Sequence, residues 1–540
     1  MDRRNFLSFG TPRRTAAKPL QANQRSNGGT QNPPAFLSRT TAGLEPYSGP
    51  FTYKEAAHLL RRCVVGPTQT EINQAVADGL DATIKKLLTP FTPSLTLIQD
   101  WAGQDPQVRP ADASQAQALQ DAVFQRREAL LKWWMGAIAT SPVSLQERMV
   151  LFWHNHFTSE MQAVNIPEFM LTQNQLFRSS MLGNFKQFVK DVTKDVAMLI
   201  YLDGAKNYKQ GQRSNINENY ARELQELYTM GVSDWDGNAN YTQQDVSEAA
   251  RALSGWGPSP SAKGSLYLGL TSLFIAQRWD SGTKTFLGKT GAWKADDIVD
   301  IIFEQRADQT AKFMCEKFYR WFVYDIPDRV VIAAMAETFR QGNWEIKPVI
   351  EQLLRSAHFF DETNIGAMEK SPTDYMIGAI RQLALTAVPD FNGQTGRNTQ
   401  DLRNRMSAQG MILFDPPNVK GWPGGRTWVS TSTLPLRQKF SIDVADGVLK
   451  NRQTPTYVFD PIAFAKQFSD PNDLTALSNE MARFLLNSEP SDAERQTLFD
   501  TILDGGKDYE WKIDDPAQKP DVRIRKFIKA AVQLAKYQLY

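Results

Sequence analysis

Short amphipathic helical segments, each closed by a helix-breaking residue, follow one another along most of the chain. Apolar residues recur at helical spacing from Tyr53 to Val65, and Gly66 and Pro67 then end the pattern. Such segments bury their apolar stripes by packing helix against helix. The sequence therefore predicts a mainly α fold, a large multi-helical bundle-like domain. Further helices are expected from Thr68 and over 114–140, 144–161, 166–180, 184–193, 217–230, 242–254, 296–323, 328–340, 345–357, 372–386, 398–410, 433–449, 459–468, 472–486, 491–504 and 521–537.

One stretch departs from this pattern. Residues 262–288 are rich in β-type side chains and carry turn signals at Asp280 to Gly282. We expect a small β-hairpin insertion there.

The length of the chain sets its domain organisation. A single core stops growing near about 250–300 residues, and this chain has 540. We expect a basic, disordered N-terminal arm over 1–50 and a helical domain over 51–540. That domain is either undivided or split into two lobes, 51–437 and 438–540.

Charge and cysteine content exclude several classes of protein. With 61 basic and 59 acidic residues, the net charge of +2 gives no general attraction to nucleic acid. No apolar run reaches about 18 residues, so no transmembrane span is expected. Cys63 and Cys315 both lie in apolar helical patterns, which favours buried free thiols and leaves one long-range disulfide as the alternative.

The N-terminus carries a partial export signal. Arg3 and Arg4 are followed by Phe6 and Leu7, as in the core of a twin-arginine signal. A complete signal also needs an apolar stretch of about 7–15 residues, which is missing here. An exported or periplasmic protein and a cytoplasmic protein with a basic arm both fit this pattern.

Residues 215–257 concentrate carboxylates, amides and arginines in helical register. Glu218, Arg222 and Glu226 form one stripe, and Glu223 belongs to a neighbouring one. Thr242 and Asp245 have the spacing of a capping box that opens the next helix, and Thr68 with Glu71 and Ser144 with Glu147 have the same spacing. The stripe fits either a cleft wall for acid/base work or cation binding, or an ion-pair network that joins two helices.

Two of the four histidines, His154 and His156, lie in the helical segment LFWHNHF. Positions two apart on a helix point nearly opposite ways, so both reach one metal ion only where the helix ends. Each is either a ligand or general base beside a carboxylate, or a satisfied core histidine. Zincin, P-loop, GxSxG and dinucleotide-binding patterns are all missing from the sequence.

Residues 415–428, DPPNVKGWPGGRTW, combine rigid prolines, flexible glycines and aromatic rings. Trp422, Arg426 and Trp428 fit a platform for a sugar ring or a peptide. They equally fit a stiff loop whose tryptophans point into the core.

Five motifs, taken in order, are similar to an uncharacterised bacterial family, domain of unknown function 1800. The motifs are HLLRRCVVGPT, MVLFWHNHF, NENYARELQELYTMGV, YTQQDVSEAARALSGW and PPNVKGWPGG. The resemblance implies a mostly helical fold, frequent export, and frequent genetic pairing with a sulfatase-like family, domain of unknown function 1501. It implies no agreed activity. Family members often have a His-Asp pair where this chain has Trp279 and Asp280.

Two functional hypotheses follow. The first is an exported interaction protein that binds a co-produced protein of the domain of unknown function 1501 family. The second is a hydrolase-type enzyme with a His/Glu cleft, with or without a metal ion. Its candidate catalytic residues are His154, His156, Glu218, Arg222, Glu223 and Asp245. The sequence names no substrate, cofactor or metal.

Overall fold

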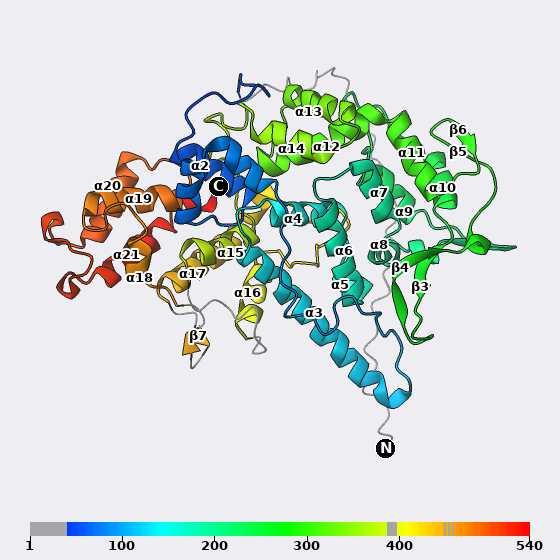
Figure 1. Cartoon of the computed structure of the whole chain (residues 1–540), viewed down its shortest axis with the longest axis horizontal. Helices are drawn as coiled ribbons and strands as arrows, with labels where there is room; N and C mark the ends of the chain where they lie inside the picture. The colour runs from blue at the N-terminus through cyan, green and yellow to red at the C-terminus, as the bar shows by residue number, and fades with distance from the viewer. Residues whose placement is uncertain (1–39, 386–396, 448–449, 452–453, 456–457) are drawn as a thin grey trace. The chain divides into compact units, whose positions relative to one another are not determined.

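The computed structural model describes residues 40–385, 397–447, 450–451, 454–455 and 458–540, so the twin-arginine segment lies outside the described residues. The fold is mainly α, as predicted (Figure 1). The α-helices are α1 Tyr53–Cys63, α2 Gln69–Leu87, α3 Ala116–Ala139, α4 Gln146–His156, α5 Met161–Val164, α6 Pro167–Ser180, α7 Phe185–Thr193, α8 Val196–Tyr201, α9 Asn219–Glu226, α10 Gln243–Ala252, α11 Ala295–Gln305, α12 Ala307–Phe322, α13 Arg329–Gln341, α14 Ile346–Leu354, α15 Pro372–Gln382, α16 Arg397–Ala408, α17 Thr433–Ala445, α18 Pro461–Ala465, α19 Leu474–Leu486, α20 Asp492–Leu503 and α21 Pro520–Ala531.

The strands pair only as small antiparallel hairpins in the part of the chain that the structure describes. They are β1 Tyr208–Gln210 with β2 Arg213–Asn215, β3 Trp256–Pro260 with β4 Leu268–Phe274, β5 Lys284–Phe286 with β6 Lys289–Gly291, and β7 Lys450–Asn451 with β8 Thr454–Pro455.

The expected β-hairpin insertion is confirmed, and it consists of two hairpins, β3–β4 and β5–β6. The chain reverses between β3 and β4, and residues 280–282 instead precede β5 of a second hairpin. The sequence signal at Asp280 to Gly282 marked a bend before β5 but not the turn that joins β3 and β4.

Side-chain caps explain where several of the predicted helices begin. Thr68 caps α2 and Thr242 caps α10, each with a reciprocal capping box, as predicted. The capping box expected at Ser144 and Glu147 is wrong. Ser144 donates instead to the carbonyl oxygen of Thr89, and Glu147 turns inward to accept from the indole of Trp134. Because Glu147 is buried, its carboxylate accepts a hydrogen bond from Trp134 and not from the backbone at the start of α4.

The helix expected over 296–323 is two helices. Arg306 leaves helical geometry between α11 and α12, with φ −130° and ψ 33°. Its guanidinium Nε donates to the carbonyl oxygen of Asn240 at 2.7 Å. A contact with a distant segment therefore accompanies a break that the sequence periodicity does not mark.

Helix α4 lies at the centre of the core. All of its side chains except Asn155 are buried. The ring of Trp153 packs against those of Phe157, Phe185 and Phe188, with centroids 5.0–6.0 Å apart. These large rings bury much apolar surface on one helix. The residues around α4 are therefore held in place more firmly than those of a surface helix.

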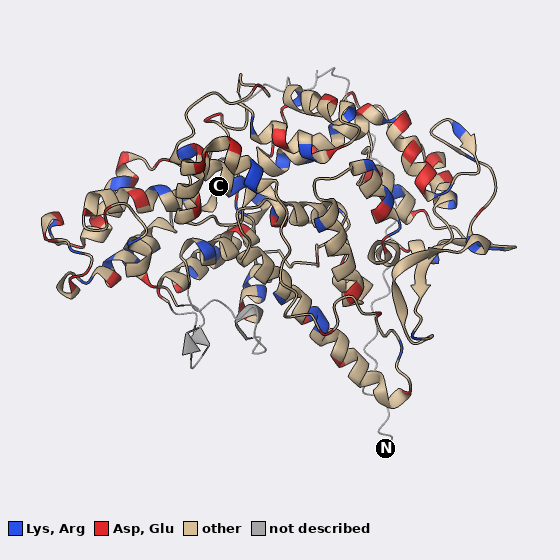
Figure 2. Ribbon diagram, viewed as in Figure 1, with Lys and Arg blue, Asp and Glu red and all other residues tan. Residues whose placement is uncertain are grey.

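Residues 38–540 form one compact unit. Cys63 and Cys315 are buried and free, as favoured by their apolar surroundings. Within the described ranges, no helix is both long enough and apolar enough to span a bilayer. Figure 2 shows both signs of charge spread over the helices, whereas β3 and β4 carry no charged side chain.

Candidate functional site

His154 lies in an aromatic enclosure. The rings of Trp134, Phe414 and Trp422 surround the imidazole at centroid distances of 5.5–5.6 Å. Its Nε2 has no hydrogen-bond partner among the described residues, and burial lowers its pKa to about 3. The imidazole is therefore neutral across the physiological range, and no carboxylate among the described residues orients it as a base.

His156 is buried, and its two ring nitrogens make polar contacts with two other segments of the chain. Its Nε2 lies 3.1 Å from the carbonyl oxygen of Tyr228, and its Nδ1 lies 2.9 Å from Nζ of Lys317. Because a carbonyl only accepts, Nε2 carries the proton and Nδ1 accepts from the lysine. Burial, and then the charge of Lys317, hold the pKa of His156 well below its usual range. The C-terminal end of α4, the segment that follows α9, and α12 thus meet at His156.

Glu218 and Arg222 belong to a network between α9 and α10. Glu218 accepts from Arg222 at 3.1 Å, from Gln243 at 2.7 Å and from the hydroxyl of Ser247. The hydrogen bond from Ser247 is the main reason that the pKa of Glu218 is lowered. These contacts match the ion-pair interpretation of the stripe.

Asp245 lies apart from the histidine contacts. One carboxyl oxygen caps α10 through Thr242, and the other accepts from the backbone N–H of Leu287 at 2.8 Å. Asp245 thus fastens the loop between β5 and β6 to the start of α10.

Glu223 is the one predicted carboxylate with a raised pKa. Burial, and then the charge of Glu226, raise the pKa of Glu223 to about 7. Arg222 and Lys420 oppose the shift. A carboxyl group that titrates near neutral pH is suited to proton transfer.

The pH dependence of stability should reveal this shift. The pKa of Glu223 is about 4.5 in the unfolded chain and about 7 in the folded protein, so between these pH values the folded state binds the proton more tightly. The free energy of unfolding therefore falls as pH rises from about 4.5 to about 7. Above pH 7 the whole of this destabilisation is present. Glu223→Gln should therefore match the wild type at pH 4.5 and exceed it at pH 8. The full pKa shift of Glu223 corresponds to about 3 kcal/mol. Solvent around the half-buried carboxyl group reduces the expected gain in the free energy of unfolding to about 1–2 kcal/mol at pH 8.

Urea unfolding at several pH values measures this difference. The carboxylate of Glu304 is exposed, so Glu304→Gln is the control and should show no such trend. A Glu223→Gln advantage that does not depend on pH would contradict the raised pKa.

The described contacts of His156 and those of Glu218 and Asp245 involve different residues. His156 contacts the carbonyl oxygen of Tyr228, just after the end of α9. The described partners of Glu218 and Asp245 lie on α9, at or in α10, and in the β5–β6 loop. Among the residues that the structure describes, no group of three or more His, Cys, Asp or Glu is placed to hold a metal ion.

A cavity of about 270 Å³ lies between α4, α12 and residues 420–428. It is lined in part by Arg148, Phe152, Asn155 and His156 of α4, by Lys317, Arg320 and Trp321 of α12, and by Lys420, Trp422 and Trp428. Trp422 and Trp428 are each only 5% exposed, so their rings point inward, and they also form part of the cavity wall.

Segments that carry the family resemblance meet around this cavity. The backbone N–H of Trp422 donates to Oδ1 of Asn155 at 2.6 Å, which fixes the 415–428 loop to α4. Arg148 donates to the carbonyl oxygens of Arg61 and Val64 at 3.2 and 3.4 Å, which joins α4 to the end of α1. Residues far apart in sequence thus build one wall.

Lys317 and the Arg148–Asp374 pair were not among the predicted site residues. Nη2 of Arg148 lies 2.7 Å from Oδ1 of Asp374, and both side chains are buried. Burial alone would lower the pKa of Arg148, but Asp374 raises it above its usual value. The signal available for Lys317 was a charged residue inside the apolar run KFMCEKFYRWF.

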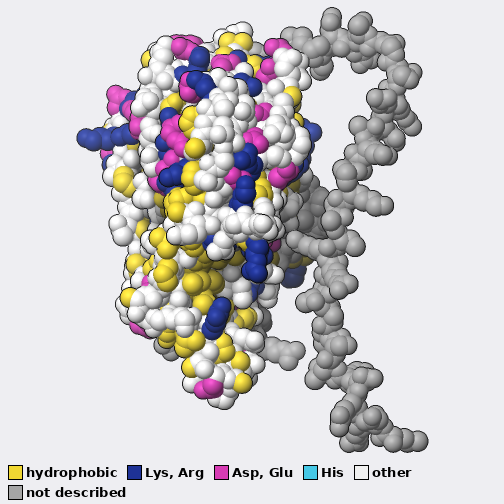
Figure 3. All heavy atoms as spheres, turned by 90° about the vertical axis from the view of Figure 1, so that its right-hand side faces the viewer, with side chains coloured by type: hydrophobic (Ala, Val, Ile, Leu, Met, Phe, Trp, Pro, Cys, Tyr) yellow, Lys and Arg dark blue, Asp and Glu magenta, His cyan; other side chains and the backbone are white. Residues whose placement is uncertain are grey.

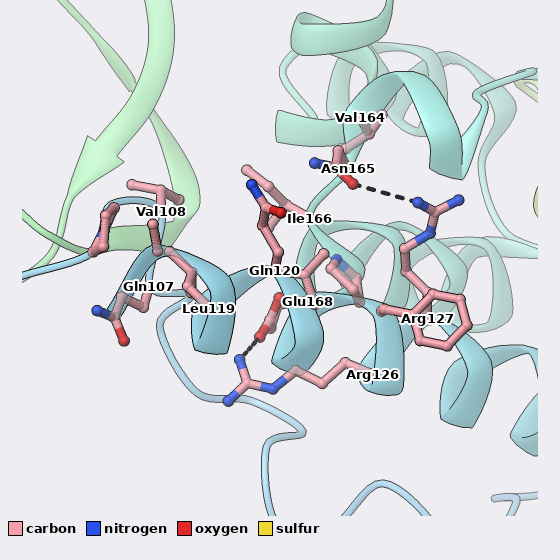
Figure 4. A pocket seen from close by; sticks show the side chains of 15 residues that line it. Gln107, Val108, Leu119, Gln120, Arg126, Arg127, Val164, Asn165, Ile166 and Glu168 are labelled. Carbon is pink, nitrogen blue, oxygen red and sulfur yellow. Dashed lines mark hydrogen bonds and ion pairs between the residues drawn. The ribbon is translucent and has the colours of Figure 1, made fainter. Parts of the chain in front are cut away.

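A second concave site lies beside the first half of α3. No side chain of residues 116–129 is buried, although α3 has 24 residues. Figure 1 shows this half extending away from α15 and α4. A groove of about 520 Å³ runs along it, lined by Leu119, Val123 and Phe124 of α3 and by Val108 and Ile166 opposite (Figure 4).

Two polar contacts lie among the residues that line this groove. Arg126 pairs with the buried carboxylate of Glu168, and Arg127 donates to Oδ1 of Asn165 at 3.5 Å. Apolar side chains form part of the groove lining, and Phe124 is 55% exposed. Figure 3, which faces the β3–β4 side, shows hydrophobic side chains gathered in its lower half and charged ones in its upper half. Leu273 of β4 is also exposed.

The fold and these sites define a mainly helical protein with a cavity lined by aromatic and charged side chains and a separate groove beside α3. A family model described as "Protein of unknown function (DUF1800)" matches residues 58–538, so the chain belongs to this family. No curated protein and no solved structure matches the chain.

Proposed function

We propose that this protein is an exported interaction protein that binds a second protein through the groove beside α3. The observation that carries the proposal is the unburied first half of α3, residues 116–129. A helix gains most of its stability in water from packing an apolar face. Leu119, Val123 and Phe124 supply such a face, and a partner would complete its packing.

The partner we propose is a co-produced sulfatase-like protein of the domain of unknown function 1501 family. The basis is the genetic pairing that the family resemblance implies. The incomplete twin-arginine motif suggests that this partner, with a complete signal, carries the protein across the membrane. Export that continues after deletion of the partner gene would exclude this shared transport.

Binding is tested with a charge placed on the groove. Phe124→Glu should weaken binding of the purified partner at least tenfold, which corresponds to about 1.4 kcal/mol. Val330→Glu on α13 is the matched control, because Val330 is 79% exposed and lies outside the groove. Both variants should fold, since both positions are exposed. Equal affinity of Phe124→Glu and wild type would contradict the proposal.

A second candidate is a hydrolase-type enzyme, and the raised pKa of Glu223 favours it. In this proposal Glu223 transfers the proton, and Lys420, whose charge acts on Glu223 and which lines the cavity, binds an anionic part of the substrate. Purified protein should hydrolyse at least one ester, glycoside or sulfate ester chromogenic substrate, and Glu223→Gln should abolish that activity. Metal analysis of the same sample would show whether an ion takes part.

A further inference from the structure

The aromatic cavity encloses an amine. Lys317 lines this cavity, and its Nζ lies 4.7 Å from the centroid of the Phe313 ring. Phe152, Trp321 and Trp422 form apolar parts of the wall. The volume of about 270 Å³ is close to the lower limit of about 300 Å³ for small-molecule sites. The cavity thus suits a small molecule with an apolar or aromatic body.

The two described partners of the amine both accept hydrogen bonds. Nζ lies 2.9 Å from Nδ1 of His156 and 3.0 Å from the carbonyl oxygen of Leu227. Glu316, its neighbour in sequence, pairs with Arg320 instead. Lys317 itself forms no ion pair with a carboxylate among the residues that the structure describes.

These contacts orient the nitrogen. His156 Nδ1 accepts because Nε2 donates to Tyr228, and a backbone carbonyl can only accept. In the neutral amine both hydrogens are then engaged, and the lone pair takes the remaining tetrahedral direction. Burial lowers the pKa of Lys317 to about 7, so much of the amine is neutral at neutral pH. The charged groups that neighbour it or line the cavity are Arg148, Glu316, Arg320, Asp325, Glu369, Asp374 and Lys420.

We propose that Lys317 forms a reversible imine with a small apolar or aromatic aldehyde or ketone bound in this cavity. Nζ attacks the carbonyl carbon to form a C–N bond, and the resulting carbinolamine loses its oxygen. Both amine hydrogens leave with that oxygen as water, so C=N replaces C=O and no oxidant or reductant is needed. His156 acts as a positioning residue that holds the amine. The site is separate from the α3 groove and does not depend on protein binding.

Reductive trapping of the wild-type full-length chain tests the proposal without a variant. The protein is incubated with benzaldehyde and sodium cyanoborohydride at pH 7, and the benzylated lysines are located and quantified by peptide mass spectrometry. Lys317 should be labelled at least tenfold faster than Lys206, whose side chain is 75% exposed. An ordinary lysine, with a pKa of about 10.4, is only about 0.04% neutral at this pH.

The concentration dependence separates a binding site from a reactive surface amine. Labelling of Lys317 should saturate with benzaldehyde, whereas labelling of Lys206 should rise linearly. His156→Ala, which removes the acceptor, should slow labelling of Lys317 and leave Lys206 unchanged. Labelling of Lys317 no faster than Lys206, or with linear dependence on aldehyde, would overturn the proposal.

Discussion

Arg148→Met should lower the free energy of unfolding by about 3–5 kcal/mol, because it leaves the carboxylate of Asp374 buried without its counter-ion. Nη2 of Arg148 lies 2.7 Å from Oδ1 of Asp374, and both side chains are buried. The same guanidinium also donates to carbonyl oxygens at the end of α1. One substitution therefore weakens the contacts among α1, α4 and α15. Urea unfolding followed by circular dichroism measures the loss.

Two further variants show whether the buried charge is the cause. Arg426→Met removes an arginine that is 87% exposed and 3.8 Å from Glu369, so it should change stability by less than about 0.5 kcal/mol. The double variant Arg148→Met/Asp374→Leu should regain part of the loss, since the carboxylate that Arg148→Met leaves without its ion-pair partner is then absent. No recovery in the double variant would mean that lost packing, not the isolated carboxylate, causes the effect.

Gly421→Ala should destabilise the protein by about 2–5 kcal/mol and loosen the 415–428 loop from α4. Gly421 has φ +84°, and an added Cβ would lie 2.5 Å from the carbonyl oxygen of Asn155. Left-handed strain costs about 1–3 kcal/mol, and overpacking adds a similar amount. The adjacent hydrogen bond from Trp422 to Asn155 would then lengthen or break. Tryptophan fluorescence should shift to longer wavelength as Trp422 becomes solvated.

Gly424→Ala provides a matched control within the same loop. Gly424 also has positive φ, +71°, but no atom lies within 4 Å of its added Cβ. Its ψ of −179° with this φ is a conformation that favours glycine, so Gly424→Ala should lose about 1–3 kcal/mol from backbone strain but keep the wild-type fluorescence. Equal effects at the two glycines would show that the contact with Asn155 does not hold the loop.

Local sequence signals predicted much of the secondary structure. The capping boxes at Thr68 and Thr242 work through residues three apart, so their spacing alone reveals them. The same spacing failed at Glu147, which accepts hydrogen bonds from Trp134 and from Arg178 on α6. Residues 31 positions apart form the second contact, and no local pattern encodes it.

The candidate site was only partly predictable, for the same reason. The sequence drew attention to His156, but not to Lys317, which lies 161 positions away and reaches it across the core. It also placed carboxylates on α9 without revealing that Glu218 turns toward Ser247 of α10. The catalytic roles of the six candidate residues remain predictions.

The unburied end of α3 has an energetic consequence for recognition. Its backbone amides can exchange with solvent through local unwinding that leaves the core closed, since no side chain of residues 116–129 is fully buried. A ligand that docks there would have to supply the ordering free energy of the helical turns it stabilises. Slower deuterium uptake confined to this segment would then report occupancy of the groove.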